Sequence, residues 1–388
     1  IISFFILYFA AFTYLFYVKG MQSIEMIHSK EEIQFIKKYE KKLHHIRHYN
    51  NFNFKHTKVN ELLFTEEQKH NGKDNFLFMG DSWFEQLIFY KDSNKKINNY
   101  FNKKKISYTN SAISSYSPIL HTLQYKILKD DFKLNPNYLV IYVDQIDFGD
   151  EICRYKKNRY FDKNSGKLKG VKDPFNLTRT SVFYDITNSN SHYLIKDLRM
   201  FNFLINEKIR IIKNRIRRIF GSDINLYGCN VSKIFNNLIN PTNEEIQYFQ
   251  RSIDFMLNTI TKDNNIKKIL VVTFPHRNNI KNIKNFSIKK ERVTKEMLKL
   301  DIFKENKDFK KLIVKDFSVN VADFVNVYIS KSNNKKVNHL DFTKKNNSGK
   351  IEISNKMYRK GDPTAHLNPY GHLNVFTRGI VEEIDYLL

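Results

Sequence analysis

Strand-like apolar runs alternate with helix-like patterns along most of this chain. The apolar runs of strand length cover residues 75–79, 105–109, 138–143, 268–276 and 311–317. Apolar positions at helical spacing cover residues 82–91, 118–128, 243–262, 319–330 and the segment from Pro369 onward. Alternating buried strands and amphipathic helices predict a parallel sheet with helices on its faces. We therefore expect an α/β fold with three layers, α/β/α, around a parallel five-stranded sheet.

Three segments break this rhythm. Residues 24–70 are charged and polar, which favours a stalk, and residues 331–350 are rich in Lys and Asn, which favours a surface loop. Residues 151–245 form an insertion after the third strand, where they are placed to cover a site at the edge of the sheet. Within this insertion, a helix over 195–220 has an apolar stripe opposite basic side chains. That pattern is typical of a solvated cap helix or of a surface for anionic lipid or acidic polysaccharide.

Residues 1–18 contain no charged side chain and end at Lys19. At about 1.5 Å per residue, a helix of this length nearly crosses the hydrocarbon core of a bilayer. We expect a membrane anchor, with a cleaved signal peptide and a buried core helix as the two alternatives. The basic residues that follow would favour an inside location, but in so basic a chain they do not decide the orientation.

The composition limits the possible partners. The chain has 65 Lys and Arg residues against 40 Asp and Glu residues, a formal charge of +25 that suits nucleic acid or another acidic surface. The lysines are spread along the whole chain and no known nucleic-acid-binding motif is recognised, so we expect no nucleic-acid partner. Cys153 and Cys229 can form one disulfide at most and lack metal-ligand spacing. His44, His45 and His48 cluster among basic residues, which favours a solvated face, and we expect neither a metal nor a cofactor.

An abrupt change of pattern at Gly80-Asp81-Ser82 marks the first candidate site. A buried strand ends just before Gly80, and a helix begins at Ser82. Ser82 therefore lies at the carboxyl end of a strand, where parallel sheets place ligands, and at the helix end whose dipole favours negative charge. The plain alternative is that Asp81 or Ser82 only caps the helix.

A second candidate site lies in the turn Gly361-Asp-Pro-Thr-Ala-His-Leu-Asn-Pro-Tyr-Gly-His372. Asp362 and His366 are four residues apart in this turn, which allows both to reach into a site from a loop. A serine hydroxyl is a weak nucleophile until a base takes its proton, and a carboxylate orients that base. Ser82, His366 and Asp362 supply these three groups. His276, at the end of another buried strand, is a rival base that we expect to line the cleft.

Together the two motifs resemble the SGNH (GDSL-like) hydrolase superfamily. Its first block corresponds to Gly80-Asp81-Ser82 and its last to His366-Leu-Asn-Pro-Tyr-Gly-His372. Residues 108–118 and 140–147 resemble its second and third blocks less closely. The resemblance implies Ser82 as the nucleophile, His366 as the base and Asp362 as the acid that orients it.

The chain departs from the family pattern at three positions. Ser115 stands where the family usually has its oxyanion glycine, and Ile146 stands where its oxyanion asparagine is expected. A backbone N–H of Ser115, or the side chain of Gln145, would have to donate to the oxyanion instead. Asp362 precedes His366 by four residues, whereas the family norm is three.

The resemblance implies a flavodoxin-like domain over residues 72–388, with a helical cap insertion at about 151–245. In the expected order along the chain, a transmembrane anchor at 1–18 and a stalk or linker helix at 19–71 precede this domain. Trp83, Asp81 and His276 are expected to line the substrate site. The implied function is a membrane-anchored serine esterase or O-acyltransferase that acts on O-acetyl groups of a cell-envelope or exported polysaccharide, on the periplasmic or extracellular side. The alternatives are a catalytically silent glycan-binding protein of the same fold and a lipid-directed esterase.

Overall fold

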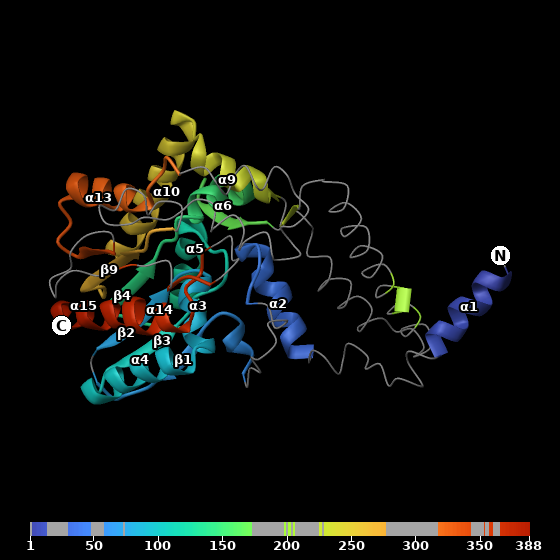
Figure 1. Cartoon of the computed structure of the whole chain (residues 1–388), viewed down its shortest axis with the longest axis horizontal. Coiled ribbons are helices and arrows are strands. Elements are labelled where there is room, and N and C mark those ends of the chain that lie inside the picture. The colour runs from blue at the N-terminus through green and yellow to red at the C-terminus, as the bar shows by residue number, and fades with distance from the viewer. Residues whose placement is uncertain are drawn as a thin grey trace.

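A six-stranded sheet forms the centre of the protein (Figure 1). The computed structural model describes residues 2–13, 30–47, 58–72, 74–172, 198, 201–202, 205, 225–226, 229–276, 317–342, 353, 357–359 and 365–388. The strands are β1 Thr65–Gln68, β2 Asn75–Met79, β3 Ser107–Asn110, β4 Tyr138–Tyr142, β9 Lys268–Thr273 and β10 Val337–Asp341. Their order is β1-β3-β2-β4-β9-β10, with β1 antiparallel to β3 and all other pairs parallel. The five parallel strands follow the 2-1-3-4-5 order of a doubly wound α/β fold.

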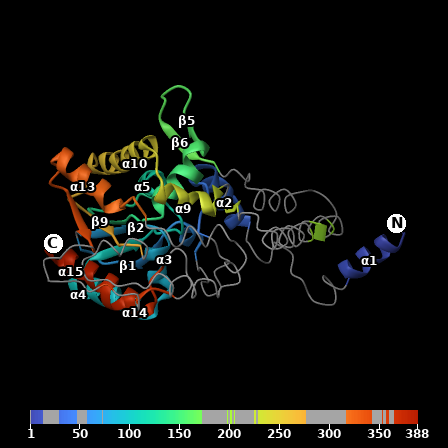
Figure 2. The same cartoon turned by 45° about the horizontal axis from the view of Figure 1, so that its top comes forward.

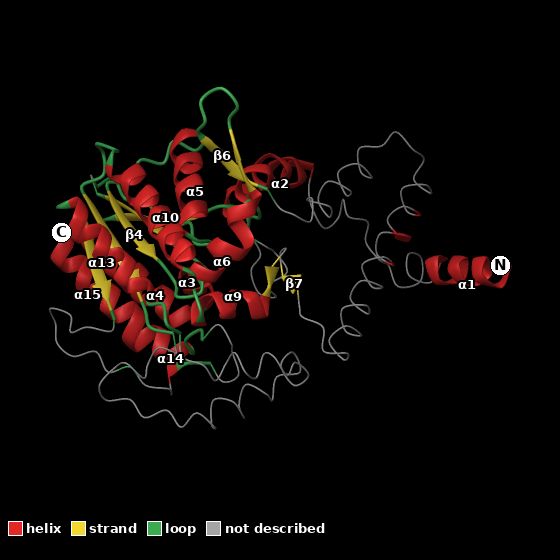
Figure 3. Cartoon of the chain, turned by 90° about the horizontal axis from the view of Figure 1, so that it is seen from above, coloured by secondary structure: helices red, strands yellow, loops and turns green. Residues whose placement is uncertain are grey.

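Helices cover both faces of this sheet (Figures 1 and 3). Strand β2 shows the alternation, because Leu77 and Met79 join one hydrophobic cluster while Phe76 and Phe78 join the other. The first cluster includes side chains of α2 Lys30–Leu43, α5 Pro118–Asp130, α9 Val231–Ile239, α10 Asn243–Thr261 and α13 Val321–Ser332. The second includes side chains of α3 Ser82–Phe89, α4 Lys91–Lys104, the π-helix η8 His372–Thr377 and α15 Arg378–Leu387. The three predicted layers are confirmed.

The prediction of a five-stranded, purely parallel sheet is wrong. Strand β1 lies in the predicted stalk and β10 in the predicted surface loop, and both are edge strands. Their sequences, Thr-Glu-Glu-Gln and Val-Asn-His-Leu-Asp, are largely polar. Polar and charged side chains protect an exposed sheet edge, and they also remove the apolar run by which a buried strand is recognised. The strand predicted over 311–317 lies outside the described residues except for Phe317, which is not in a strand.

The N-terminal helix α1 covers Ile2–Thr13 and lies apart from the sheet (Figure 1). Residues 14–18 of the predicted anchor lie outside the described residues. Among the helices that the structure describes, none is both long enough and apolar enough to cross a membrane. The described residues therefore do not support the transmembrane helix that the sequence predicts.

The described residues of the predicted stalk, 30–47 and 58–71, belong to the domain core. Helix α2 has an apolar face, and its Ile36, Tyr39 and Leu43 are buried in the same cluster as α5 and α10. The short 3₁₀ helix η3 Val59–Leu62 follows and leads into β1. The scattered apolar positions of this segment therefore form one helical stripe that packs on the domain.

The insertion after β4 is described in part. It begins with α6 Asp147–Asp150, the π-helix η4 Glu151–Tyr155 and the 3₁₀ helix η5 Lys156–Asn158. The hairpin of β5 Arg159–Phe161 and β6 Leu168–Val171 projects from the body of the protein beside α5 and α10 (Figures 2 and 3). A second, short hairpin pairs β7 Asn225–Leu226 with β8 Cys229–Asn230. Most of the helix predicted over 195–220 lies outside the described residues.

A disulfide joins the two described parts of the insertion, from Cys153 in η4 to Cys229 in β8, across a sequence separation of 76 residues. Cross-linking a loop of this length restricts the unfolded chain, so we expect Cys153→Ser/Cys229→Ser to lower the free energy of unfolding by about 4 kcal/mol. Urea unfolding of oxidised and reduced protein measures this difference. The reduced wild type should match the double variant, and a wild type that keeps its full stability after reduction would contradict the prediction.

Candidate active site

The turn between β2 and α3 places Ser82 at the first residue of a helix, at the carboxyl edge of the sheet. Asp81 caps this helix, because its carboxylate accepts a hydrogen bond from the Trp83 backbone N–H at 2.9 Å. Gly80 allows the close approach of chain segments here, since a Cβ at this position would lie 3.0 Å from the Tyr142 Cβ. The cap is therefore supplied by Asp81, which leaves the Ser82 hydroxyl available for another contact.

That contact is with His366, 284 residues further along the chain. Ser82 Oγ lies 2.5 Å from His366 Nε2, and both side chains are half-buried. This is the distance and the pair of atoms that proton transfer from a serine nucleophile to a histidine base requires. The structure therefore brings together the two residues on which the two sequence motifs depend.

The backbone around His366 is held by local hydrogen bonds. Tyr358 and Leu367 form an antiparallel bridge, and the Arg359 N–H donates to the His366 carbonyl at 2.8 Å. Asn368 caps the following short helix, α14 Pro369–Gly371, by accepting from the Gly371 N–H at 2.9 Å. These contacts fix the backbone next to the base and the start of the helix that follows it.

Ala365, which directly precedes His366, is buried and has φ +58°, in the left-handed region that is uncommon for a residue with a Cβ. Such a conformation persists only where the surroundings determine it. The backbone just before His366 therefore has one defined bend, which is unfavourable for the isolated residue.

The second histidine of the motif has a structural role. His372 is fully buried, and its ring nitrogens contact Ser93 Oγ at 2.9 Å and the Trp83 carbonyl at 3.1 Å. Burial lowers the pKa of His372 to about 4, so the ring is neutral at physiological pH. It ties the C-terminal segment to helices α3 and α4, and thereby keeps His366 next to Ser82.

The acid predicted at Asp362 lies outside the described residues. A second carboxylate, which sequence reasoning missed, lies nearby on the loop after β4. Asp144 is buried, and burial raises its pKa to about 6, while the positive charge of His366 acts in the opposite direction. It shares a hydrogen bond with Asp81, whose own pKa burial raises well above the ordinary value. Asp144 is therefore a second candidate for the carboxylate that acts on His366.

The raised pKa of Asp144 makes the stability of the protein depend on pH. The native state holds the Asp144 proton more tightly than the unfolded chain, so this contribution to stability is fully present below pH 3.8 and is lost as the pH rises through about 6. Asp144→Asn removes it. Between these two pH values, the free energy of unfolding of Asp144→Asn should rise relative to wild type by about 1.4 kcal/mol per pH unit. Urea unfolding across this range measures the difference, and a constant difference would contradict the assignment.

The loop after β3 lies against the nucleophile turn. The Ser111 N–H donates to the Phe78 carbonyl at 2.8 Å, and the Ile113 N–H donates to the Gly80 carbonyl at 3.0 Å. Ser115 in this loop has φ +67°, the conformation for which glycine is favoured. Ser115 thus has a backbone conformation that glycine adopts more readily, and its carbonyl accepts a hydrogen bond from the Tyr155 hydroxyl.

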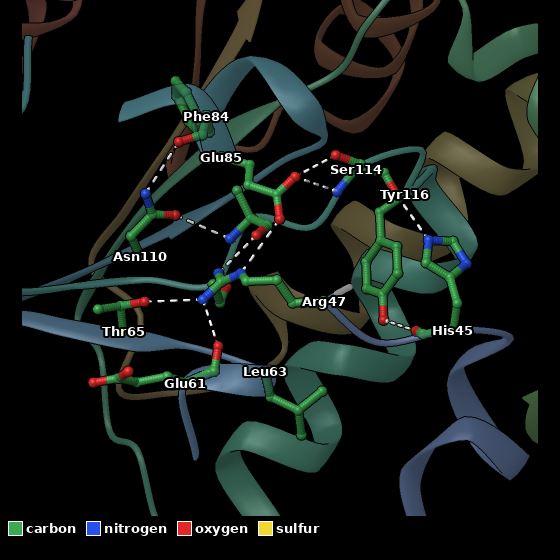
Figure 4. Close-up of polar contacts among 12 residues, drawn as sticks. His45, Arg47, Glu61, Leu63, Thr65, Phe84, Glu85, Asn110, Ser114 and Tyr116 are labelled. Atoms are coloured by element: carbon green, nitrogen blue, oxygen red, sulfur yellow. Dashed lines mark hydrogen bonds and ion pairs between the residues drawn. The ribbon is translucent and has the colours of Figure 1, made fainter. Parts of the chain in front are cut away.

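The buried Arg47 binds the backbone of the loop after β3 (Figure 4). Arg47 donates from Nη2 to the Ala112 carbonyl at 2.8 Å, and from Nη1 to the Glu61 carbonyl at 2.6 Å and Thr65 Oγ1 at 2.9 Å. Its Nε lies 3.3 Å from Glu85 Oε1, and the side chains of both partners are almost fully buried. Because Glu85 lies one turn after Ser82 on α3, this ion pair connects the nucleophile helix with the loop.

The other oxygen of Glu85 completes the connection. Glu85 Oε2 accepts from the Ser114 N–H at 3.2 Å and from the Ser114 hydroxyl. His45 Nε2 contacts the Ser114 carbonyl at 2.7 Å, and the Tyr116 hydroxyl donates to the His45 carbonyl at 2.6 Å (Figure 4). His44 and His45 are buried, so the predicted solvated face is wrong for these two residues, and His48 lies outside the described residues. Here His45 binds the backbone of the loop that precedes Ser115.

Gln145, the predicted side-chain donor of the oxyanion site, is used elsewhere. Its Nε2 donates to the Val319 carbonyl at 2.6 Å, and its Oε1 accepts from the Val321 N–H at 3.0 Å. The amide thus holds the start of α13. We therefore leave Gln145 out of the proposed oxyanion site.

The three residues predicted to line the substrate site are buried beneath it. Trp83 is 1% exposed and packs on Tyr142 and Phe274, Asp81 is 3% exposed, and His276 is 1% exposed with its ring 4.8 Å from that of Phe317. Side chains this deeply buried do not fit the prediction that they line an open substrate site. Among the described residues, no group of three or more His, Cys, Asp or Glu side chains is arranged to bind a metal ion.

Comparison with known proteins adds little to this geometry. No family model matches the chain, and no curated protein matches its sequence. The structure is similar to an acetyl xylan esterase, Est2A, from the rumen bacterium Butyrivibrio proteoclasticus, with a TM-score of 0.34 and 9% identity. The likeness covers 81% of this chain and 64% of that one, so the chain spans less than two thirds of that esterase. A likeness this weak says nothing about function. The functional argument therefore rests on the geometry of the site alone.

Proposed function

We propose that the protein is an SGNH-type serine esterase or O-acyltransferase that acts on O-acetyl groups of a cell-envelope or exported polysaccharide. The observation that carries this proposal is the 2.5 Å contact between Ser82 Oγ and His366 Nε2. The contact lies at the carboxyl edge of a mostly parallel sheet, where α/β enzymes place their reactive groups. The substrate class comes from the resemblance of the two sequence motifs.

The proposed reaction begins with attack of Ser82 Oγ on the ester carbonyl carbon while His366 Nε2 takes the hydroxyl proton. The tetrahedral intermediate collapses, the bond from carbon to the sugar oxygen breaks, and His366 returns the proton to that oxygen. Water then attacks the acyl-serine and releases acetate in an esterase, or a sugar hydroxyl attacks and becomes acylated in a transferase. Asp144, and Asp362 in the family pattern, would stabilise the protonated His366.

Two backbone N–H groups are the proposed oxyanion donors, those of Ser82 and Ser115. The positive φ of Ser115 supports this choice, because glycine, the residue that the family resemblance expects here, favours that conformation. Ile146 has no side-chain donor, and Gln145 is bonded to α13. A missing third donor would cost about 3 kcal/mol in the transition state, so we expect a slow enzyme of this class.

We further propose that the domain works on the periplasmic or extracellular side. The disulfide between Cys153 and Cys229 supports this location, since disulfides persist in oxidising compartments. The anchor at residues 1–18 is part of the same proposal.

The test compares three substrates with the full chain: acetylated xylo-oligosaccharides, p-nitrophenyl acetate and p-nitrophenyl palmitate. We expect release of acetate and nitrophenol from the two acetyl esters to exceed hydrolysis of the palmitate ester. Faster hydrolysis of palmitate would favour a lipid-directed esterase. Glycan binding without hydrolysis of any ester would favour a catalytically silent binding protein. The absence of a side-chain donor at Ile146 supports this second candidate.

A further inference from the structure

A cavity of about 580 Å³ lies beside α5, away from Ser82 and His366, which do not line it. Its lining residues belong to α5, α10 and the β5–β6 hairpin. Figures 2 and 3 show how these three elements are arranged. This volume is within the range of sites that hold a ligand of one or a few sugar rings. The cavity is open at the surface, where Phe161 of the hairpin is 55% exposed and Phe255 of α10 is 38% exposed.

The charge of the cavity wall is entirely positive. Four of its lining side chains are basic: Lys126, Arg159, Lys167 and Arg251. No carboxylate is among the described residues that line it. Of these four, Arg159 is held by an ion pair with Glu151, which lies behind the wall. A ligand with negative charge is therefore favoured over a neutral one.

Aromatic rings and unsatisfied polar atoms accompany the charge. Tyr248 and Phe255 line the cavity, with Arg159 4.7 Å from the Tyr248 ring centroid and Lys126 Nζ 5.4 Å from that of Phe255. The Tyr248 hydroxyl and Arg159 Nε are buried without a hydrogen-bond partner in the part of the chain that the structure describes. Buried polar atoms of this kind normally bind a partner, which a ligand can supply.

We propose that this cavity is a binding subsite for an acidic sugar, a pyranose ring that carries a carboxylate, within the acylated polysaccharide. The carboxylate would pair with Arg251 and Lys126, the ring face would stack on Phe255, and a sugar hydroxyl would bond the Tyr248 hydroxyl. The four basic side chains favour an acidic sugar over a neutral one, and the aromatic rings favour a ligand with an apolar ring face. The choice of a polysaccharide rests on the proposed function.

The subsite is connected to the active-site loop. Glu151, which pairs with Arg159, also accepts from the Ser117 hydroxyl and from the Ile119 N–H at 3.3 Å. Ser117 follows Ser115 by two residues and precedes helix α5. A sugar bound in this cavity would therefore lie beside Arg159, whose partner Glu151 also bonds the segment between the proposed oxyanion loop and α5.

Calorimetric titration of the full chain with hexagalacturonate and with neutral xylohexaose tests the proposal. In about 150 mM salt, which screens long-range attraction, wild type should bind hexagalacturonate at least about tenfold more tightly than xylohexaose. Lys126→Ala/Arg251→Ala should weaken hexagalacturonate binding by about tenfold or more, and Phe255→Ala by about three- to tenfold. Arg159 is left unchanged because its removal would leave Glu151 buried without its partner.

A matched control separates the cavity from the general charge of the chain. Lys95→Ala/Lys103→Ala removes two exposed lysines of α4, on the opposite face of the sheet, and should leave binding unchanged. Equal weakening by the control pair, unchanged binding in the cavity variants, or equal binding of both oligosaccharides would overturn the proposal. Ser82→Ala should bind hexagalacturonate as wild type does, so a failed esterase assay and a failed subsite are distinguishable.

Discussion

Replacement of Ser82 by Ala should lower kcat/KM for acetyl esters by at least about a thousandfold. The reason is the loss of the attacking oxygen, which lies 2.5 Å from its base in the wild type. Initial rates of p-nitrophenol release from p-nitrophenyl acetate measure the effect. The residual activity of Ser82→Ala should come only from substrate binding and from the backbone N–H groups that stabilise the oxyanion.

Two further variants make this result specific to the pair. His366→Ala should cause a loss of similar size, and Ser82→Ala/His366→Ala should be no slower than either single variant, because the two residues act as one unit. Ser82 is not the helix cap, so Ser82→Ala should keep the wild-type unfolding midpoint. Multiplicative losses in the double variant, or rates equal to wild type in Ser82→Ala, would refute the nucleophile assignment.

The second large effect is expected at Arg47. Arg47→Leu leaves Glu85 buried without its cation, and loss of one partner of a buried ion pair typically costs about 3–5 kcal/mol of stability. Arg378→Leu is the matched control, since its pair with Glu382 is exposed and should cost less than about 1 kcal/mol. Urea unfolding compares both variants with wild type. Equal losses in the two variants would contradict the buried network described above.

The same variant tests whether the network positions the active-site loop. Under conditions where Arg47→Leu remains folded, we expect kcat to fall by about tenfold or more while KM changes little, because a displaced oxyanion donor affects the transition state alone. Glu85→Gln keeps an oxygen for Ser114 and should retain more activity. A destabilised Arg47→Leu with the kcat of wild type would show that the network is purely structural.

Much of the parallel core could be predicted because its strands are buried on both faces. Residues 75–79 and 138–142 form continuous apolar runs, and the structure places strands there. The edge strands β1 and β10 could not be recognised, since an edge strand pairs through its backbone and tolerates polar side chains. Helix α4, residues 91–104, was also missed, because its apolar positions are few among Lys and Asn.

The candidate site was predictable where local sequence carries it. Ser82 and His366 lie in short motifs. Neighbouring residues of these motifs have local structural roles: Asn368 caps a helix, and Gly80 allows close packing. The contributions of Arg47, Glu85 and Asp144 could not be predicted, because each depends on tertiary contacts between distant segments. Gln145 was placed correctly in its loop, but its hydrogen bonds to α13 depend on a segment more than a hundred residues away.

Labelling with a fluorophosphonate is the measurement that tests the central claim most directly. Such a reagent reacts with a serine only when its hydroxyl is activated by a base. Intact-mass analysis of the full chain should show one phosphonate per molecule, and peptide mapping should place it on Ser82, with no adduct in Ser82→Ala and strongly slowed labelling in His366→Ala. A wild-type chain that takes up no reagent, or takes it up at another residue, would contradict the account of Ser82 as a nucleophile activated by His366.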